Sequence, residues 1–192
     1  MIDFTRYPNL EARRRQMKGR LKDKAPLIGK DTWQKCVQNW EIFTEEELQR
    51  INEDCQNVEF IQADGFKCAS PSFITRDAVI VTQPHFTAIP LRDVIWVYEY
   101  ALKHSVNFIP TSKDYTIYLV ARDGISYTLM TTSVMAVSKK DPGPQAINQV
   151  REAIGDQYPG VIYGWSQEVQ KMRDSNFNAL VQYVDSHNVQ EQ

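Results

Sequence analysis

The sequence has few of the residues on which catalysis and metal binding usually depend. It contains three cysteines and three histidines among 192 residues. Cys36, Cys55 and Cys68 are odd in number, and their spacing matches neither a disulfide framework nor a paired zinc-ligand motif. We therefore expect reduced, buried cysteines and no metal site.

Glycine is also sparse, and its positions argue against a phosphate-binding loop. The eight glycines form neither a Gly-x-Gly-x-x-Gly run nor a Walker-type loop, and no serine lies in a Gly-x-Ser-x-Gly elbow. His85 falls in an expected loop, His104 in an expected polar linker and His187 in the polar tail. We assign no catalytic residue and no cofactor. An enzyme whose site combines distant residues, such as His85 with Asp93 or Cys68, is the remaining catalytic alternative.

Long apolar runs and a strong net charge are missing as well. No stretch of about 18 apolar residues occurs, and residues 1–15 lack the apolar core of a signal peptide. The net charge of −2 does not indicate a general nucleic-acid binder. These features favour a cytoplasmic protein of bacterial type.

The charge is nevertheless unevenly distributed along the chain. Residues 1–30 carry nine Lys or Arg and three acids, a local charge of +6, so the remainder sums to −8. A basic helix that docks on the acidic body is one interpretation, and a helix that binds an anionic lipid surface is another. The candidate lipid- or partner-facing residues are Arg13, Arg14, Arg15, Lys18, Arg20, Lys22 and Lys24.

Helical signals dominate the first third of the chain. The pattern over residues 9–21 places Leu10 and Met17 on one stripe, and Trp33 and Trp40 fall on one face of a second short helix. Thr44 with Glu47 forms a capping box for a third helix. We expect an N-terminal helical extension over residues 1–57, joined to residues 58–192 in one compact unit. If the two tryptophans are exposed, they are candidate dimer contacts.

After residue 57 the periodicity becomes alternating. Asp64-Gly65 between residues 58–62 and 66–69 predicts a hairpin, and Asp123-Gly124 between residues 115–121 and 125–131 predicts a second one. A further strand is expected over residues 94–100. Helical patterns return over residues 144–154, and then in a last helix that Ser166 caps and that continues to Val184. Helices before and after an antiparallel meander define the α+β class.

Six aromatic residues lie on strands that we expect to be neighbours. Four of them lack interleaved Lys or Arg, so we expect core packing with hydroxyls at the rim and no nucleic-acid platform. The six are Trp96, Tyr98, Tyr100, Tyr115, Tyr118 and Tyr127.

Residues 70–184 resemble a group of uncharacterised bacterial proteins with pleckstrin-homology-like domains. The segments that carry the resemblance are Phe73-Ile74-Thr75-Arg76-Asp77, the run from Ile89 to Tyr98, Thr111-Ser112-Lys113, Asp123-Gly124, Tyr158-Pro159 and Gly164-Trp165-Ser166. The resemblance implies a strongly bent antiparallel sheet that a C-terminal helix closes at one end, and it implies no ligand.

The expected function follows from these absences and from the fold. We expect a non-catalytic scaffold or protein-interaction module in which a curved sheet presents an edge or groove to an unknown protein or peptide. A peripheral anionic-lipid binder that uses the basic N-terminal helix is the alternative, and the sequence leaves an oligomer possible.

Overall fold

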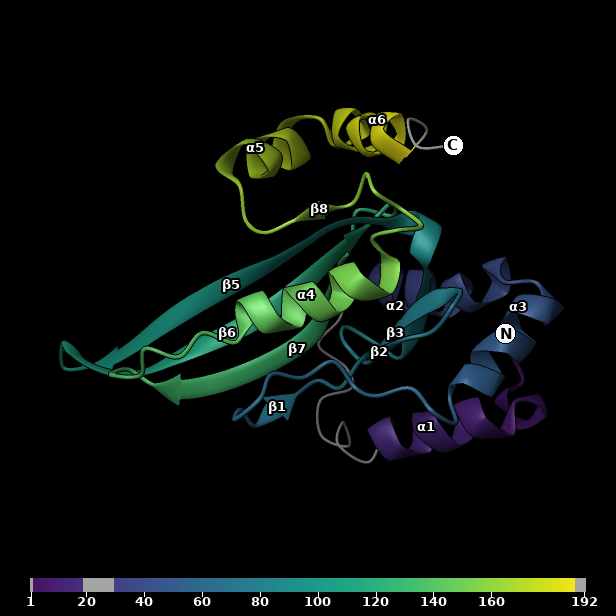
Figure 1. The fold of residues 1–192 in the computed structure, drawn as a ribbon, viewed down its shortest axis with the longest axis horizontal. Coiled ribbons are helices and arrows are strands. Elements are labelled where there is room, and N and C mark those ends of the chain that lie inside the picture. The colour runs from purple at the N-terminus through teal and green to yellow at the C-terminus, as the bar shows by residue number, and fades with distance from the viewer. Residues whose placement is uncertain (1, 19–29, 189–192) are drawn as a thin grey trace.

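The helices lie at both ends of the chain and the strands lie between them (Figure 1). The computed structural model describes residues 2–18 and 30–188. Its helices are η1 (Phe4–Arg6), α1 (Pro8–Lys18), α2 (Lys30–Gln38), η2 (Asn39–Ile42), α3 (Glu45–Asp54), η3 (Leu91–Asp93), α4 (Gly143–Ile154), α5 (Gln167–Ser175) and α6 (Phe177–Asn188). Its strands are β1 (Cys68–Ala69), β2 (Phe73–Ile74), β3 (Ala78–Val81), β4 (Thr87–Pro90), β5 (Val94–Val106), β6 (Ile109–Ala121), β7 (Ser126–Met135) and β8 (Ile162–Tyr163). The α+β class expected from the sequence is confirmed.

The strands form two sheets. A five-stranded sheet has the order β1-β7-β6-β5-β8, and a three-stranded sheet has the order β2-β3-β4. The pairs among β1, β5, β6 and β7 are antiparallel, as expected, but β8 pairs with β5 in parallel. The long connection through α4 returns the chain to the edge of β5, which a meander of tight turns does not allow.

The three-stranded sheet is buried on both faces. Val79 and Val81 of β3 pack in one apolar cluster with the five-stranded sheet and α4, whereas Ala78 and Ile80 pack in another with α1 and α3. All four residues are fully buried. This explains the continuous apolar run of β3, because a strand that is covered on both faces has no solvent-facing positions.

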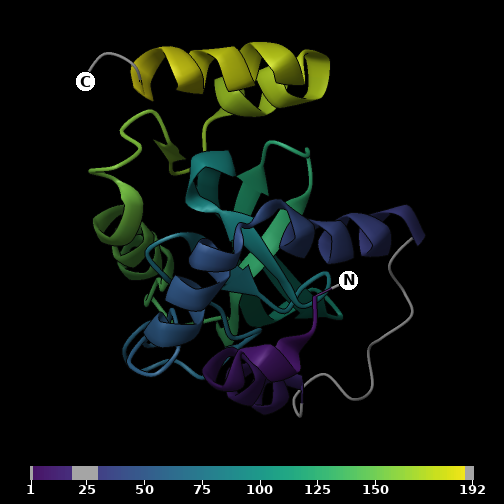
Figure 2. The same ribbon diagram turned by 90° about the vertical axis from the view of Figure 1, so that its right-hand side faces the viewer.

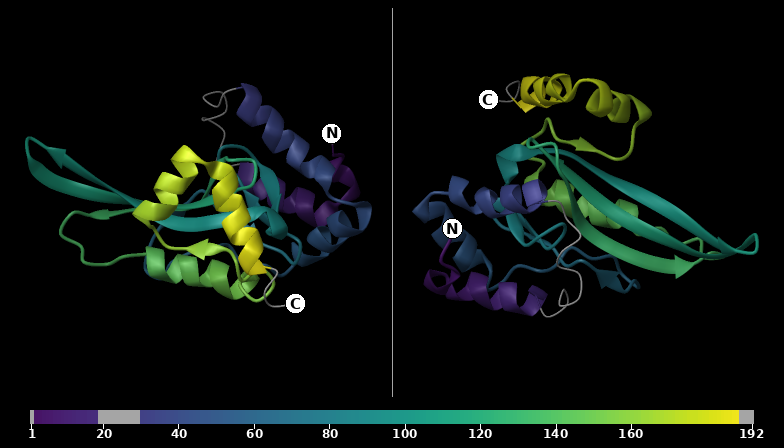
Figure 3. Two further views of the ribbon diagram at one scale, coloured as in Figure 1. Left: turned by 90° about the horizontal axis from the view of Figure 1, so that it is seen from above. Right: turned by 180° about the vertical axis from the view of Figure 1, so that it is seen from behind.

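Helices cover the two faces of the five-stranded sheet near its inner end. On one face α4 runs along the strands, and on the other α5 and α6 pack over β5 and β6 (Figures 1 and 3). Trp96 and Val120 are buried there against Leu180 and Val184. The outer half of the β5–β6 hairpin extends beyond α5 and α6 (Figure 3).

The N-terminal helices pack together at the end of the molecule opposite the hairpin turn (Figure 2). The capping box of α3 is confirmed, since both Thr44 and Glu47 make their reciprocal hydrogen bonds. Leu10 and Met17 of α1 are buried, as the stripe predicts. Trp40 is 3% exposed and stacks on Phe86, so it does not present a free surface for a dimer, and the side chain of Trp33 lies outside the described part of the chain.

Three local expectations are wrong. Residues 58–62 and 66–69 do not pair as a hairpin, because the main-chain N–H groups of Gln62 and Asp64 bond to side chains of α4 and β1 pairs with β7. The last helical pattern is two helices, because Asn176 ends α5 and its side chain accepts the N–H of Ala179 in α6. His104 lies inside β5 and not in a linker.

Candidate functional site

The outer part of the β5–β6 hairpin, residues 99–116, projects from the body, and we call it the arm (Figure 1). Its two strands pair up to the turn, at Val106 and Ile109, with one register shift after His104. Asn107 and Phe108 form the turn with φ values of 50° and 65°. A two-residue turn with positive φ at both positions matches the twist of the strands, although this conformation is costly for phenylalanine.

One edge of the arm has no neighbouring strand. β8 pairs with β5 at Trp96 and Val97 only, and the N–H of Gly164 donates to the carbonyl of Val97. Since main-chain groups alternate in direction along a strand, Glu99, Ala101 and Lys103 also turn their N–H and C=O groups away from β6. Within residues 2–18 and 30–188, no strand pairs with these three residues on that side.

The side chains along this open edge differ between the two faces. On the face that carries α4, Glu99, Ala101 and Lys103 follow one another. On the other face, Tyr100 is 51% exposed and Leu102 is 46% exposed. The aromatic prediction is therefore wrong for Tyr100, which lies beyond the cover of α5 and α6.

Lys103 lies directly opposite another cation. Its cross-strand neighbour on β6 is Lys113, whose Nζ donates to the carbonyl of Ser138 at 2.9 Å. No ion pair of Lys103 occurs in the described part of the chain. Like charges directly opposite one another on a sheet repel, so an acidic group from outside the chain would be favourable here.

The tip of the arm is apolar and exposed. Phe108 is completely exposed, and Val106 and Ile109, which pair across the turn, are 62% and 68% exposed. Met135 and Val137 lie beside β6 near the tip and are exposed as well. The positive φ of Phe108 costs conformational free energy, and the side chain gains no burial within the monomer. This combination points to a contact of Phe108 with something outside the monomer.

Glu99 forms a carboxyl pair with Asp141 where the arm meets α4. Burial, the hydrogen bond to Asp141 and the negative charge of Asp141 raise the pKa of Glu99 to about 8. The N–H of Gly143 partly opposes this rise, because it bonds to the Glu99 carboxyl. The N–H of Gly143 also donates to Oδ1 of Asp141 at 2.9 Å. A Cβ at Gly143 would overlap the Glu99 carboxyl, so glycine leaves the space that the pair occupies.

The basic residues of α1 are largely engaged within the chain. Arg13 donates to the carbonyls of Cys55 and Val58, and the Arg14 guanidinium bonds to Glu11 and lies over the ring of Phe4. Arg15 also bonds to Glu11, and its side chain is 74% exposed. Arg20, Lys22, Lys24 and the side chain of Lys18 lie outside the described residues.

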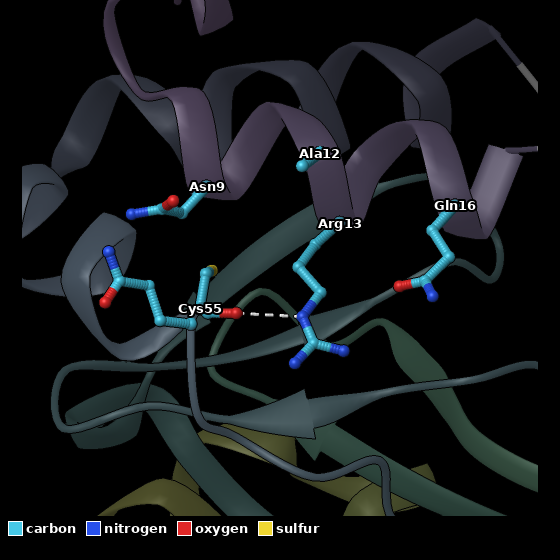
Figure 4. A pocket seen from close by; sticks show the side chains of 6 residues that line it. Asn9, Ala12, Arg13, Gln16 and Cys55 are labelled. Atoms are coloured by element: carbon cyan, nitrogen blue, oxygen red, sulfur yellow. Dashed lines mark hydrogen bonds between the residues drawn. The ribbon is translucent and has the colours of Figure 1, made fainter.

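A shallow depression lies between α1 and the end of α3 (Figure 4). Arg13 points into it and bonds to the carbonyl of Cys55, while Asn9 and Gln16 line its rim. Burial raises the pKa of the Cys55 thiol to about 12. The depression therefore offers neither a free cation nor a thiolate nucleophile.

The dispersed residues of the catalytic alternative lie on separate elements. His85 lies between β3 and β4, where its main chain bonds to the thiol of Cys36, and Cys68 lies in β1. Asp93 lies in η3 beside Arg122, 3.6 Å away. Burial raises the pKa of Cys36 to about 11. His104 bonds to Asp114 at 2.7 Å on the exposed arm.

The described residues contain neither a metal-binding cluster nor a membrane-spanning helix. No group of three or more His, Cys, Asp or Glu side chains there could hold a metal ion. No helix in the same ranges combines the length and apolarity that a bilayer span needs.

The open edge of the arm was not predicted from the sequence. Asn107, a residue typical of turns, was the signal that could have indicated the β5–β6 hairpin. Comparison with family models, with curated proteins and with solved structures found no match, so the pleckstrin-homology-like resemblance stays a prediction from the sequence.

Proposed function

We propose that the protein is a non-catalytic interaction module that binds an extended polypeptide segment along the open edge of β5. The observation that carries this proposal is the set of outward main-chain groups of Glu99, Ala101 and Lys103. An extended segment can satisfy these groups by adding a strand to the sheet. These residues are exposed, whereas natural proteins commonly cover their sheet edges.

The side chains beside the edge define the chemistry of the segment. Tyr100 and Leu102 favour apolar residues at alternate positions, since cross-strand neighbours share a face. Lys103, on the opposite face, favours an acidic residue across from it. We therefore expect a segment that alternates apolar residues with polar ones and carries at least one acid.

Hydrogen exchange would test this mode of binding. Peptides selected from a random display library for binding to the full chain should slow amide exchange at Ala101 and Lys103. Tyr100 and Leu102 serve as internal controls, because their N–H groups face β6 and are protected already. Unchanged exchange at Ala101 and Lys103 in the bound state would refute edge binding.

Substitution at the edge gives the second readout. Ala101→Pro removes an outward donor and places a ring in the path of an added strand, so we expect peptide affinity to fall about tenfold or more. Proline is tolerated on edge strands, and the urea midpoint of the variant would check that the fold persists. Lys103→Glu should weaken the binding of acidic peptides, whereas Lys171→Glu on exposed α5 should not.

The tip of the arm favours a second candidate function, binding to an anionic bilayer surface. Phe108, Val106 and Ile109 form an apolar end, and Lys103 lies about 10 Å behind it, at roughly 3.3 Å per residue. An interfacial anchor typically buries its apolar groups about 5–10 Å deep, with cations at the headgroup level. We therefore extend the proposal of anionic-lipid binding, which the sequence suggested for the basic N-terminal helix, to the arm.

Vesicle co-sedimentation separates these assignments. If the arm anchors the protein, Phe108→Ser should reduce sedimentation with phosphatidylglycerol-containing vesicles several-fold, because an exposed apolar anchor is lost. Tyr183→Ser, which removes an exposed aromatic side chain on α6, should not. Binding that survives Phe108→Ser but is lost in Arg15→Gln would instead assign the contact to the N-terminal helix.

A further inference from the structure

We infer that the segment that adds to β5 is β5 of a second copy of this chain, paired antiparallel with Ala101 opposite Ala101. This inference rests on the proposed function of the open edge and names its partner. It joins two five-stranded sheets into one continuous sheet across a two-fold axis. The arm is long enough for such a contact, since it extends past α5 and α6 (Figure 3, left).

The sequence of the edge is complementary to itself in this arrangement. With Ala101 on the axis, Glu99 lies opposite Lys103 of the second copy, and Tyr100 lies opposite Leu102. The two members of each pair share a face of the joined sheet, because antiparallel partners point to the same side: Glu99 and Lys103 lie on the face of α4, and Tyr100 and Leu102 lie on the other. An aromatic–aliphatic pair is favourable across strands, and a lysine opposite a carboxyl is favourable because it stabilises the ionised form of that carboxyl.

The main chain satisfies the same arrangement. Glu99, Ala101 and Lys103 are the residues whose N–H and C=O groups face outward, and all three lie within the paired stretch. The outward groups of one copy then meet those of the other along the whole contact. No outward group between Glu99 and Lys103 is left without a partner.

The charges of the monomer favour a second copy over an unrelated strand. Lys103 faces Lys113 within its own sheet and has no acidic partner in the described residues. In the dimer it meets Glu99, which itself lies beside Asp141. The excess positive charge of one copy thus lies against the paired carboxyls of the other.

β8 sets the end of the contact. Gly164 already occupies the carbonyl of Val97, so the added strand cannot pair beyond Lys103 of the second copy. In this register Ser105 and Val106 of the second copy would face Val97 and Trp96, which β8 already pairs, so that chain leaves the sheet at the bulge after His104.

Cysteine cross-linking tests the two-fold axis directly. The Cα atoms of two residues that exchange both main-chain hydrogen bonds lie about 5.5 Å apart, which suits a disulfide. Ala101→Cys should therefore give a covalent dimer under mild oxidation. The native chain and Tyr183→Cys, with an exposed position on α6, should form no covalent dimer under the same conditions. Absence of the Ala101→Cys dimer would overturn the arrangement.

Light scattering with charge exchange tests the pairing without a new bond. The native chain should show a concentration-dependent dimer with a dissociation constant on the order of micromolar. Lys103→Glu should weaken it about tenfold or more, because two like-charge pairs replace two favourable ones. The double variant Glu99→Lys with Lys103→Glu should restore it, since both pairs are exchanged. Failure of the restoration would contradict the register.

The experiments distinguish failure of the dimer from failure of peptide binding at the edge. A chain that stays monomeric at all concentrations, while selected peptides still protect the Ala101 amide, would overturn the dimer and leave edge binding intact. A dimer that persists unchanged in Ala101→Pro would also overturn this arrangement, because its contact would then lie elsewhere, whereas edge binding is refuted only by unchanged exchange at Ala101 and Lys103 with peptide bound.

Discussion

Asn52→Ala is expected to lower the free energy of unfolding by about 2–4 kcal/mol and to release α1 from the body. Asn52 lies on α3 and is 4% exposed, and its Oδ1 accepts the N–H groups of Asn9 and Leu10 at 2.9 and 3.2 Å. These are among the donors that the first turn of a helix leaves without intrahelical partners. Alanine would leave two donors unpaired in a buried site.

Urea unfolding gives the size of this effect, and amide exchange gives its location. In Asn52→Ala, exchange should accelerate at Leu10 and Glu11 more than in β5–β7, because the lost bonds hold only α1. Asn148→Ala, an exposed asparagine on α4, is the matched control and should change the unfolding free energy little. Uniform acceleration across the whole chain would argue against local release.

The same contact shows why the basic helix was hard to place from sequence. The stripe of Leu10 and Met17 predicts a buried face, which the structure has. The partners of Arg13, however, are main-chain carbonyls and the rings of Phe60 and Phe73, not an acidic patch. A count of charged residues along the chain includes acids and bases. It does not include main-chain carbonyls that remain free to accept hydrogen bonds at and after the end of a distant helix.

Local signals were sufficient where an element stabilises itself. The capping box of α3 and the β6–β7 hairpin depend on neighbouring residues, and both are present. The turn at Gly65 is present too, with φ of 79°, but its flanking residues bond to Gln145 and Gln149 of α4. The turn could be predicted, and its flanks could not, because their partners lie more than 80 residues away.

The sequence predicted the type of candidate site, a sheet edge, but not its location. The expectation that the sheet presents an edge stays a prediction, but its location could not be read, because residues 100–103 are exposed on both faces. Such a stretch lacks the apolar alternation that marks a half-buried strand. Pairing with β6 holds it extended, and that pairing depends on the turn at Asn107 and Phe108.

The second large effect concerns the carboxyl pair at the base of the arm. Because the pKa of Glu99 is raised from 4.5 to about 8, the folded state binds a proton that the unfolded state releases within this range. Stability from this site is therefore complete below pH 4.5 and is lost as the pH rises through about 8. For a half-buried group, we expect a loss of about 1–2 kcal/mol after allowance for solvent screening.

Glu99→Gln should flatten this dependence, because glutamine fills the same space and can donate to Asp141 without ionising. Urea unfolding of the native chain and the variant from pH 5 to 9 would measure it. Low protein concentration is needed, because Lys103 of a second copy would stabilise the ionised form of Glu99. Glu152→Gln on the exposed face of α4 should keep the native slope. If Glu99→Gln keeps it as well, the proton does not reside on the Glu99–Asp141 pair, and burial at the base of the arm does not control stability in this range.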